Sequence, residues 1–269
     1  MKYKMIVSDL DDTLLNSHGK ISDKDKEAII KAQENGVIFV LASGRPTYAM
    51  RDLAQELKLD KFGSFILSYN GSIITNCKTN QNISEETLTK EDIHLLYDFS
   101  KKNNVEIITY LDDSIVSEDY SSYIEVEVEL TKMPFEKVKN FKATIDKDCV
   151  KCILLAEPKY LKQVEEKLKD ELGNEFSISI SKPFFLEVTK LGIDKGSSLL
   201  KLAKKLGIAQ NEIIAIGDSY NDLPMLKIVG MPTCVGNAKS EIKNICKFIS
   251  TSNNNSGVAG IIENLIFKK

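Results

Sequence analysis

The first part of the chain alternates short apolar runs with longer segments of mixed polarity. Three apolar runs have the length of buried strands, over residues 4–8, 37–41 and 65–68. Between the first two, the pattern predicts a helix over residues 22–35, with Ser22 as a candidate N-cap and Gly36 as its stop. A second helix is expected after Pro46, a residue that suits a first helical turn. Buried strands that alternate with helices favour a parallel sheet covered on both faces.

The same alternation returns towards the end of the chain. The predicted elements are a helix over 194–206, a strand over 212–216, a helix from Asn221, a strand over 231–235 and a helix over 258–267. We therefore expect the first and last parts of the chain to build one domain, although the middle of the sequence separates them.

The middle of the chain has a less regular pattern. Helices are predicted over 90–102 and 158–172, and strands over 105–110, 114–117, 151–156, 176–180 and 184–188. Residues 124–129 alternate as a strand would but could also lie in a helix, so both interpretations stay open. Before this region, Asn70-Gly71 stands between two β-rich segments and is typical of a hairpin.

Together these elements predict a fold class. We expect an α/β protein whose core is a Rossmann-like, doubly wound parallel sheet, interrupted by an inserted α+β module. The core domain is predicted to comprise residues 1–82 and 190–269, and the inserted domain residues 83–189.

Composition narrows the possible functions. With 269 residues, of which 42% are hydrophobic, the chain can bury a substantial core. A formal net charge of −3 gives no electrostatic reason to expect nucleic-acid binding. The apolar runs are far too short to span a bilayer, and the run at residues 5–7 is too short for a secretion signal. We therefore expect a cytoplasmic protein without nucleic-acid or membrane partners.

The cysteines do not suggest a metal or redox centre. There are five, an odd and scattered set that suits a reducing compartment. Cys149 and Cys152 have a spacing that can serve redox chemistry or zinc binding, but no second pair accompanies them. Residues three apart on a strand also point to opposite faces. We expect a structural role for both.

Four short polar stretches stand where strands are predicted to end or a helix to begin. They are Asp9-Leu10-Asp11-Asp12-Thr13-Leu14, Ala42-Ser43-Gly44-Arg45-Pro46, Lys195-Gly196 and Gly217-Asp218-Ser219-Tyr220-Asn221-Asp222. In a doubly wound sheet, ligands bind beyond the carboxyl ends of the strands. Asp9, Ser43 and Asp218 all fall at that end, so they can converge although they are far apart in sequence.

The acids in these stretches indicate metal-dependent phosphoryl transfer. Asp9 and Asp11 are two apart, so in an extended segment both side chains face the same way. A divalent cation would offset their repulsion; oxygen ligands favour Mg²⁺, and Asp218 would add a third carboxylate. Acids at a strand end can instead merely cap the following turn. All four stretches in this order favour a magnesium-dependent phosphatase.

Simpler structural interpretations compete for single residues. Lys195 begins a lysine-rich helix, where most lysines are merely solvated, but its place before Gly196 singles it out. Ser43 could cap the helix expected after it, which is compatible with phosphate binding at the same helix end. Arg45 could contact substrate or form a surface ion pair. Asn237 is expected to be a turn residue that supports the site.

With these stretches the chain resembles the haloacid dehalogenase-like phosphohydrolases. It resembles in particular the Cof-type sugar-phosphatase branch, whose larger cap is inserted between the second and third motifs. The resemblance covers essentially the whole chain and extends to Asn70-Gly71 and to residues 235–238 and 256–259. Asp12 stands where many members carry glycine. In the inserted region the resemblance concerns only type and position.

The resemblance implies a role for each site residue. Asp9 would be the nucleophile that forms an aspartyl-phosphate, and Asp11 the general acid and then the general base. Mg²⁺ would be held by Asp9, Asp218 and the backbone carbonyl of Asp11. The phosphoryl oxygens would be bound by Ser43, the Gly44 N–H, Lys195 and Asn221. Supporting roles would fall to Thr13, Asp222, Arg45 and Asn70.

The leading hypothesis is a phosphatase that acts on a small phosphorylated metabolite, with sugar phosphates as the first candidates. A phosphoglycosyl mutase is the enzyme alternative, but residues 82–188 contain no arginine to grip a second phosphate. A phospho-acceptor signalling module is the second alternative, and both Asp11 and the large insertion count against it. The intact set of acids disfavours a catalytically silent interaction protein.

Overall fold

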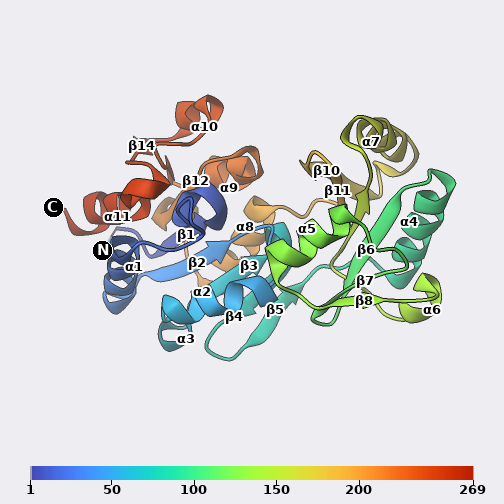
Figure 1. Cartoon of the computed structure of the whole chain (residues 1–269). Helices are drawn as coiled ribbons and strands as arrows, with labels where there is room; N and C mark the ends of the chain where they lie inside the picture. Colours follow the sequence, from blue (N-terminus) through green and yellow to red (C-terminus); the bar gives the residue numbers. More distant parts are fainter. Residues whose placement is uncertain (1, 269) are drawn as a thin grey trace. The chain divides into compact units, whose positions relative to one another are not determined.

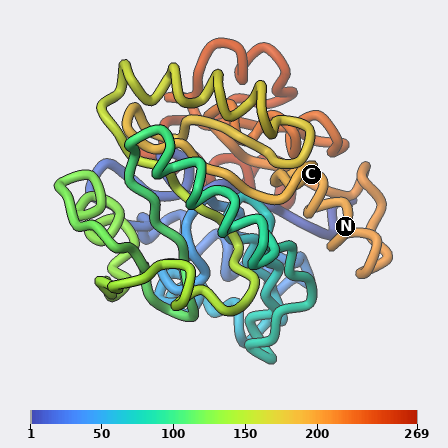
Figure 2. The backbone as a smooth tube through the Cα atoms, turned by 90° about the vertical axis from the view of Figure 1, so that its right-hand side faces the viewer, coloured from blue at the N-terminus to red at the C-terminus, as the bar shows by residue number. Residues whose placement is uncertain are grey.

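The chain folds into two units, which the computed structural model describes over residues 2–268. One unit is formed by Met1–Ser84 together with Asp194–Lys269, and the other by Glu85–Ile193. We call them the core unit and the inserted unit. The tube view shows the blue N-terminal part of the chain and its orange-to-red C-terminal part together in the core unit (Figure 2).

A mostly parallel sheet of eight strands forms the middle layer of the core unit (Figure 1). At its centre, β1 (Met5–Asp9) pairs in parallel with β2 (Ile38–Ala42) and with β12 (Ile213–Gly217). The other strands are β3 (Phe65–Ser68), β4 (Ile73–Asn76), β5 (Gln81–Glu85), β13 (Met231–Cys234) and β14 (Phe248–Ile249). The order β14-β13-β12-β1-β2-β3-β4-β5 confirms the predicted doubly wound α/β class.

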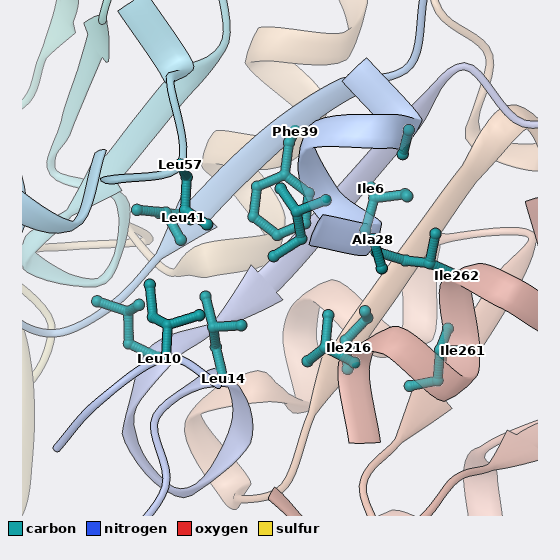
Figure 3. Close-up of a cluster of buried hydrophobic side chains, with 14 of the residues drawn as sticks. Ile6, Leu10, Leu14, Ala28, Phe39, Leu41, Leu57, Ile216, Ile261 and Ile262 are labelled. Carbon is teal, nitrogen blue, oxygen red and sulfur yellow. The ribbon is translucent and has the colours of Figure 1, made fainter. Parts of the chain in front are cut away.

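Apolar residues fill β1 because each face of the sheet packs against its own helices. Ile6 belongs to one buried cluster, whereas Met5 and Val7 belong to another. The first cluster includes residues of α1 (Asp23–Glu34) and α11 (Gly257–Ile262), and Figure 3 shows its side chains gathered between these helices and the sheet. The second includes residues of α8 (Lys195–Leu206), α9 (Leu223–Ile228) and α10 (Ser240–Ile245). Each large side chain buried in this way contributes about 1.5–3 kcal/mol.

The predicted helix signals hold for α1, and a helical segment also follows Pro46 as predicted. The Ser22 Oγ accepts the Asp25 N–H at 3.1 Å, and Gly36 follows the helix end with a φ of +83°. This segment begins as a 3₁₀ turn (Tyr48–Met50), continues directly into the short helix α2 (Arg51–Glu56) and is followed by a second short helix, α3 (Leu59–Phe62). Lys58 separates these helices because its left-handed φ of 56° cannot continue an α-helix.

The turn at Asn70-Gly71 joins a hairpin, as the sequence predicts. β3 and β4 pair antiparallel, with Ser68 opposite Ile73. The connection is longer than a two-residue turn and contains a 3₁₀ turn over Tyr69–Gly71. Asn70 takes a left-handed φ of 55°, which asparagine tolerates better than most residues.

The inserted unit is built on a second sheet, of six strands in the order β10-β11-β9-β6-β7-β8. Its strands are β6 (Glu106–Leu111), β7 (Ser114–Ser117), β8 (Phe135–Lys137), β9 (Lys151–Leu155), β10 (Phe176–Lys182) and β11 (Phe185–Lys190). Its helices are α4 (Lys90–Lys102), α5 (Ser122–Thr131), α6 (Phe141–Thr144) and α7 (Pro158–Leu172). The ambiguous residues 124–129 are helical, because Ser121 caps α5 and Ile124, Glu127 and Thr131 form one buried face.

One face of this second sheet packs against α4 and α7. The predicted stripe of α7 is buried at Leu161, Val164 and Leu168. It joins strand residues such as Leu154 in the apolar core of the inserted unit. Cys149 and Cys152 are buried free thiols of the same core, and burial raises the pKa of Cys149 to about 11. A raised pKa leaves a thiol mostly protonated and unreactive.

Several short elements were not predicted from the sequence, among them three strands at or near the edges of the sheets. β5, β8 and β14 were not predicted, nor was α10. The residues of β5 are largely polar and exposed, so no apolar pattern marks them. β14 has two residues and forms only by pairing with β13. Backbone pairing with a neighbouring strand, rather than a local pattern, defines such elements.

No helix within residues 2–268 has both the length and the apolar character needed to cross a membrane.

Candidate active site

The four polar stretches lie at the carboxyl ends of the central strands of the core unit and at the start of α8. Asp9 is the last residue of β1, Ser43 follows β2 and Asp218 follows β12. Because β1 pairs in parallel with both β2 and β12, these three ends meet at one edge of the sheet. The fold therefore brings together residues that are far apart in sequence.

Lys195 is buried at this edge between two carboxylates. Its Nζ lies 2.5 Å from Oδ1 of Asp9 and 2.7 Å from Oδ1 of Asp222, and its side chain is 0% exposed. Burial alone would lower the pKa of Lys195, but Asp9 and Asp222 raise it above its ordinary value, so the ammonium stays charged. The N-cap Asp194 fixes the start of this helix by accepting the Ser197 N–H at 2.8 Å.

A close approach of two helices places Lys195 beside Asp222. A Cβ on Gly196 would lie 2.6 Å from the carbonyl carbon of Pro224, so only glycine lets α8 approach α9 this closely. Asp222 immediately precedes α9 and therefore meets the lysine at the start of α8. Gly196 thus allows the close contact between the helices that places Lys195 beside Asp222.

Asp222 also shapes the loop that follows β12. Its Oδ2 accepts the backbone N–H groups of Asp218 at 2.9 Å and Ser219 at 3.1 Å, while its Oδ1 binds Lys195. A Cβ on Gly217 would lie 2.6 Å from the Asp222 carboxyl carbon, so glycine is needed at the turn. Protein donors therefore occupy both oxygens of Asp222.

Asp9 and Asp218 are buried acids whose pKa values are raised. Burial, reinforced by Asp222 and Asp218, raises the pKa of Asp9 well above its ordinary value although Lys195 opposes the shift. Burial also raises the pKa of Asp218 to about 6, although the Thr13 Oγ1–H donates to its Oδ1 at 2.8 Å. Thr13 thus links the loop after β1 to the loop after β12.

The acid cluster fits a divalent cation. Carboxylate oxygens of Asp9, Asp218 and Asp222 lie within 4.8 Å of one another. Within residues 2–268, no hydrogen-bond donor binds Oδ2 of Asp9 or Oδ2 of Asp218. Hard oxygen donors with surplus negative charge are what Mg²⁺ prefers. The third carboxylate of the cluster belongs to Asp222, not to Asp11, but protein donors already occupy it.

The Asp11 side chain points to Arg45 and not into this cluster. The guanidinium binds both carboxylate oxygens, with Nη2 2.6 Å from Oδ1 and Nε 3.0 Å from Oδ2. Asp11 is 55% exposed at its side chain, and the next residue, Asp12, has a left-handed φ of 59°. The extended path of β1 ends at Leu10, where a helical turn over Leu10–Leu14 begins, so Asp9 and Asp11 do not face the same way.

Ser43, Gly44 and Asn70 form a second polar group beside the acids. The Ser43 carbonyl accepts the Asn70 N–H at 2.8 Å, and the Ser43 Oγ accepts the Arg45 N–H at 3.1 Å. A Cβ on Gly44 would lie 3.2 Å from the Asn70 amide nitrogen. Oδ1 of Asn70 is buried and has no partner within residues 2–268. Asn221 is exposed in the turn that precedes α9.

Comparisons with known proteins identify the family of the chain. A family model for haloacid dehalogenase-like hydrolases matches residues 6–262. The chain belongs to the haloacid dehalogenase-like hydrolases. A solved haloacid dehalogenase-like hydrolase from Bacteroides thetaiotaomicron is 40% identical, with a TM-score of 0.93 over 98% of this chain and 100% of that one. A crystal structure from Thermotoga maritima is 26% identical, with a TM-score of 0.88 over 99% of this chain and 98% of that one.

Several curated relatives of this hydrolase are named phosphatases. The 5-amino-6-(5-phospho-D-ribitylamino)uracil phosphatase YcsE of Bacillus subtilis is 31% identical, over 98% of this chain and 96% of the relative. The phosphatase YwpJ of the same organism is 25% identical, over 98% of this chain and 100% of the relative. Family membership and these relatives identify the chain as an enzyme of the phosphatase class.

In this hydrolase, two asparagines support the loop after β1: Asn237, for which the sequence predicted a supporting role, and Asn253, which it left unassigned. The Asn237 Nδ2–H donates to the Asp12 carbonyl at 2.7 Å, and its Oδ1 accepts the Asn253 N–H at 2.9 Å. The Asn253 Nδ2–H donates to the Leu15 carbonyl at 2.9 Å. Asn253 stands in a run of polar loop residues, so no local signal marks its role.

Proposed function

We propose that this enzyme is a magnesium-dependent phosphatase that hydrolyses small phosphate monoesters, with sugar phosphates as the first candidates, through an aspartyl-phosphate intermediate. The observation that carries the proposal is the pairing of Asp9 with a fully buried, charged Lys195 at the end of the central strand. A carboxylate for covalent catalysis and a fixed cation for phosphoryl oxygens stand side by side.

Asp9 would be the nucleophile. Lys195 binds its Oδ1, while its Oδ2 has no donor within residues 2–268 and keeps its lone pairs for attack on phosphorus. In the first step an Asp9 oxygen–phosphorus bond forms and the bond from phosphorus to the leaving oxygen breaks. In the second step water attacks phosphorus and releases Asp9 and phosphate.

Asp11 would move the protons. It would donate a proton to the leaving oxygen in the first step and take one from the attacking water in the second. Binding of the phosphoryl oxygens would fall to Ser43, the Gly44 N–H, Lys195 and Asn221. Supporting roles would fall to Thr13 and Asp222, whose hydrogen bonds hold the loop after β12, and to Asn70, which lies against Gly44.

The residues that would hold Mg²⁺ are Asp9, Asp218 and the backbone carbonyl of Asp11. When bound, the ion would neutralise charge on the phosphoryl oxygens and lower the repulsion among the carboxylates. The unengaged oxygens of Asp9 and Asp218 support this assignment.

The inserted unit would be the cap that selects the substrate. The boundaries that we propose for it are residues 83–189, close to the observed unit of Glu85–Ile193. The relative named for a phosphoribitylaminouracil supports a small phosphorylated molecule with a polyol or sugar part as the substrate class.

A substrate screen with and without metal tests the proposal. Phosphate release should be measured for sugar phosphates, nucleotides, flavin mononucleotide and pyridoxal phosphate, with MgCl₂ or with EDTA. We expect turnover of sugar phosphates only with MgCl₂, and a loss of about 10⁴-fold or more in Asp9→Asn. Asp23→Asn, an exposed aspartate in α1, is the matched control and should keep wild-type turnover. Wild-type activity in Asp9→Asn would contradict the mechanism.

Binding of the metal can be tested apart from activity. Mg²⁺ at about 100 times its dissociation constant should stabilise the folded chain by about 2.7 kcal/mol. The increase in Tm should disappear in Asp218→Asn and persist in Asp23→Asn. An equal increase in all three proteins would place the ion elsewhere.

A further inference from the structure

The sequence predicted a supporting role for Arg45 without saying what it supports, and in the structure its guanidinium binds both carboxylate oxygens of Asp11. We propose that Arg45 is a positioning residue for Asp11, which fixes the carboxylate that exchanges a proton with the leaving oxygen. This inference rests on the proposed function, because it requires Asp11 to be the general acid.

The contact has the geometry of a fork. Nη2 lies 2.6 Å from Oδ1 and Nε lies 3.0 Å from Oδ2, so both oxygens of Asp11 are held at once. Two parallel N–H···O bonds fix the plane of a carboxylate as well as its distance, which a single ammonium cannot do. Each oxygen keeps a second lone pair for the proton that it must accept or donate.

The arginine end of the contact is anchored through its backbone. The Arg45 N–H donates to the Ser43 Oγ at 3.1 Å, and the Arg45 carbonyl accepts the Tyr69 N–H at 2.9 Å. The guanidinium therefore extends from a fixed point next to the proposed phosphate-binding residues Ser43 and Gly44.

At the other end of the contact, the backbone next to Asp11 is held in place, but its carboxylate is held only by Arg45. The carbonyl of Asp12 accepts the Asn237 Nδ2–H at 2.7 Å, which holds the turn that follows Asp11. The Asp11 carboxylate itself is 55% exposed, and within residues 2–268 Arg45 is its only side-chain partner. Without the guanidinium, this carboxylate would be free to sample other rotamers in water.

Folding stability does not explain the ion pair between Arg45 and Asp11. Ion pairs between exposed groups contribute little to folding, because both partners are well solvated when apart. Their orientation matters more for catalysis, since a displacement of about 1 Å in a catalytic group can cost about 100-fold in rate. We therefore expect loss of Arg45 to impair protonation of the leaving oxygen rather than folding.

The decisive measurement is the dependence of kcat/KM on the leaving group. This constant covers the steps up to cleavage of the ester, in which the bond from phosphorus to the leaving oxygen breaks and the proton of Asp11 passes to that oxygen. p-Nitrophenyl phosphate needs little such help because its leaving group is a weak base. Phenyl phosphate needs more, and an alkyl phosphate needs most.

We expect Arg45→Met to lose about 10- to 100-fold in kcat/KM for the alkyl phosphate and less than about threefold for p-nitrophenyl phosphate. Arg45→Lys should regain only part of the loss, because one ammonium cannot hold both oxygens. Asp11→Asn should show an even steeper leaving-group dependence. Adding Arg45→Met to Asp11→Asn should cause no further steepening, because the arginine would have nothing left to position.

Arg51→Met is the matched control, since Arg51 is exposed, lies in α2 and stacks on the Tyr48 ring with its Cζ 5.6 Å from the centroid. It should keep the wild-type leaving-group dependence.

An equal loss for all esters in Arg45→Met, or multiplicative losses in the double variant, would overturn the inference and make Arg45 a phosphate ligand. An unchanged dependence in Asp11→Asn would overturn the proposed acid role as well. If Arg45→Met does not fold, Arg45→Gln with the same ester series decides in its place.

Discussion

Within residues 2–268, each unit of this phosphatase buries one lysine among acids, and the two clusters differ in the number of carboxylates that face the lysine. In the core unit, Lys195 is 0% exposed and lies between Asp9 and Asp222. In the inserted unit, Lys151 is 2% exposed and its Nζ lies 3.1 Å from Glu187. Burial of a charged lysine is therefore not by itself a mark of an active site in this chain.

The cluster of the inserted unit is closed. Lys151 and Glu187 stand on neighbouring strands, β9 and β11, and the Lys151 ammonium lies 5.2 Å from the centroid of the Tyr110 ring. The Tyr110 O–H donates in turn to Glu127 of α5. These groups come from the interior of a sheet and from the helix packed on it. Such a network fixes α5 against the strands, and within residues 2–268 none of its buried side-chain oxygen or nitrogen atoms lacks a hydrogen-bond partner.

The cluster of the core unit is open. Its acids come from loops at strand ends, three carboxylates face one ammonium, and one oxygen each of Asp9 and Asp218 has no donor within residues 2–268. The comparison teaches that an excess of carboxylates and a position in loops distinguish the reactive cluster from the structural one. The carboxyl ends of parallel strands supply both.

The largest expected effect separates the two lysines by activity. Lys195→Met should lower kcat for any phosphate ester by about 10²- to 10³-fold or more, because the fixed charge for phosphoryl oxygens is lost. Lys151→Met should change kcat for p-nitrophenyl phosphate by less than about threefold. Steady-state kinetics at a temperature where both variants are folded checks the difference. Similar losses in the two variants would erase the distinction between open and closed clusters.

The second largest effect concerns the free energy of unfolding, and here the change is expected for Lys151, whose loss should leave activity nearly unchanged. Lys151→Met leaves Glu187, whose side chain is only 14% exposed, without its ammonium partner, so the free energy of unfolding should fall by about 3–5 kcal/mol. The double variant Lys151→Met/Glu187→Met should recover most of that loss. Urea unfolding gives both values. Lys26→Met, which removes a surface ion pair with a Lys26 Nζ to Glu56 Oε1 distance of 3.2 Å, should cost less than about 1 kcal/mol.

A smaller effect depends on pH and on Glu127. Burial raises the pKa of Glu127 above its ordinary value of 4.5, while Lys151, the Tyr110 hydrogen bond and Lys182 oppose the shift and Glu187 adds to it. The folded state therefore binds the proton more tightly than the unfolded chain, and stability falls as the pH rises from the unfolded pKa through the folded one. Glu127→Gln does not titrate and can still accept the Tyr110 hydrogen bond.

Relative to wild type, Glu127→Gln should thus gain stability across that pH interval and keep the gain at higher pH. Urea midpoints at pH 4, 5, 6, 7 and 8 check the trend. A difference that does not vary with pH would mean that Glu127 has the same pKa in the folded and unfolded states.

The smallest effect concerns Asp12, which departs from the glycine that many family members carry. Its left-handed φ of 59° is a conformation that glycine adopts without strain. Asp12 also contributes to the raised pKa of Asp218. Asp12→Gly should therefore change the free energy of unfolding by less than about 1 kcal/mol and kcat by less than about twofold. A loss of more than about tenfold in kcat would show that the carboxylate has a role of its own.

Some of these features could be predicted from the sequence, and the reason is local. The apolar runs before Asp9, Ser43 and Asp218 predicted three strands, and parallel strands end at one edge of a sheet. The convergence of the acids followed from that topology alone. The edge strand β5 could not be predicted because its residues carry no apolar pattern and pair only through the backbone.

The features of the candidate site, too, divide into those that the sequence predicted and those that it did not. The sequence determined which chemical groups are available and that they lie at strand ends, because hydrophobic periodicity fixes where each strand stops. Only the tertiary structure decided their partners. The turn that begins at Leu10 directs the Asp11 carboxylate to Arg45, and the contact of Gly196 with Pro224 places Lys195 between Asp9 and Asp222. These outcomes depend on the direction of single turns and on the distance between packed helices, which no local pattern of residues encodes.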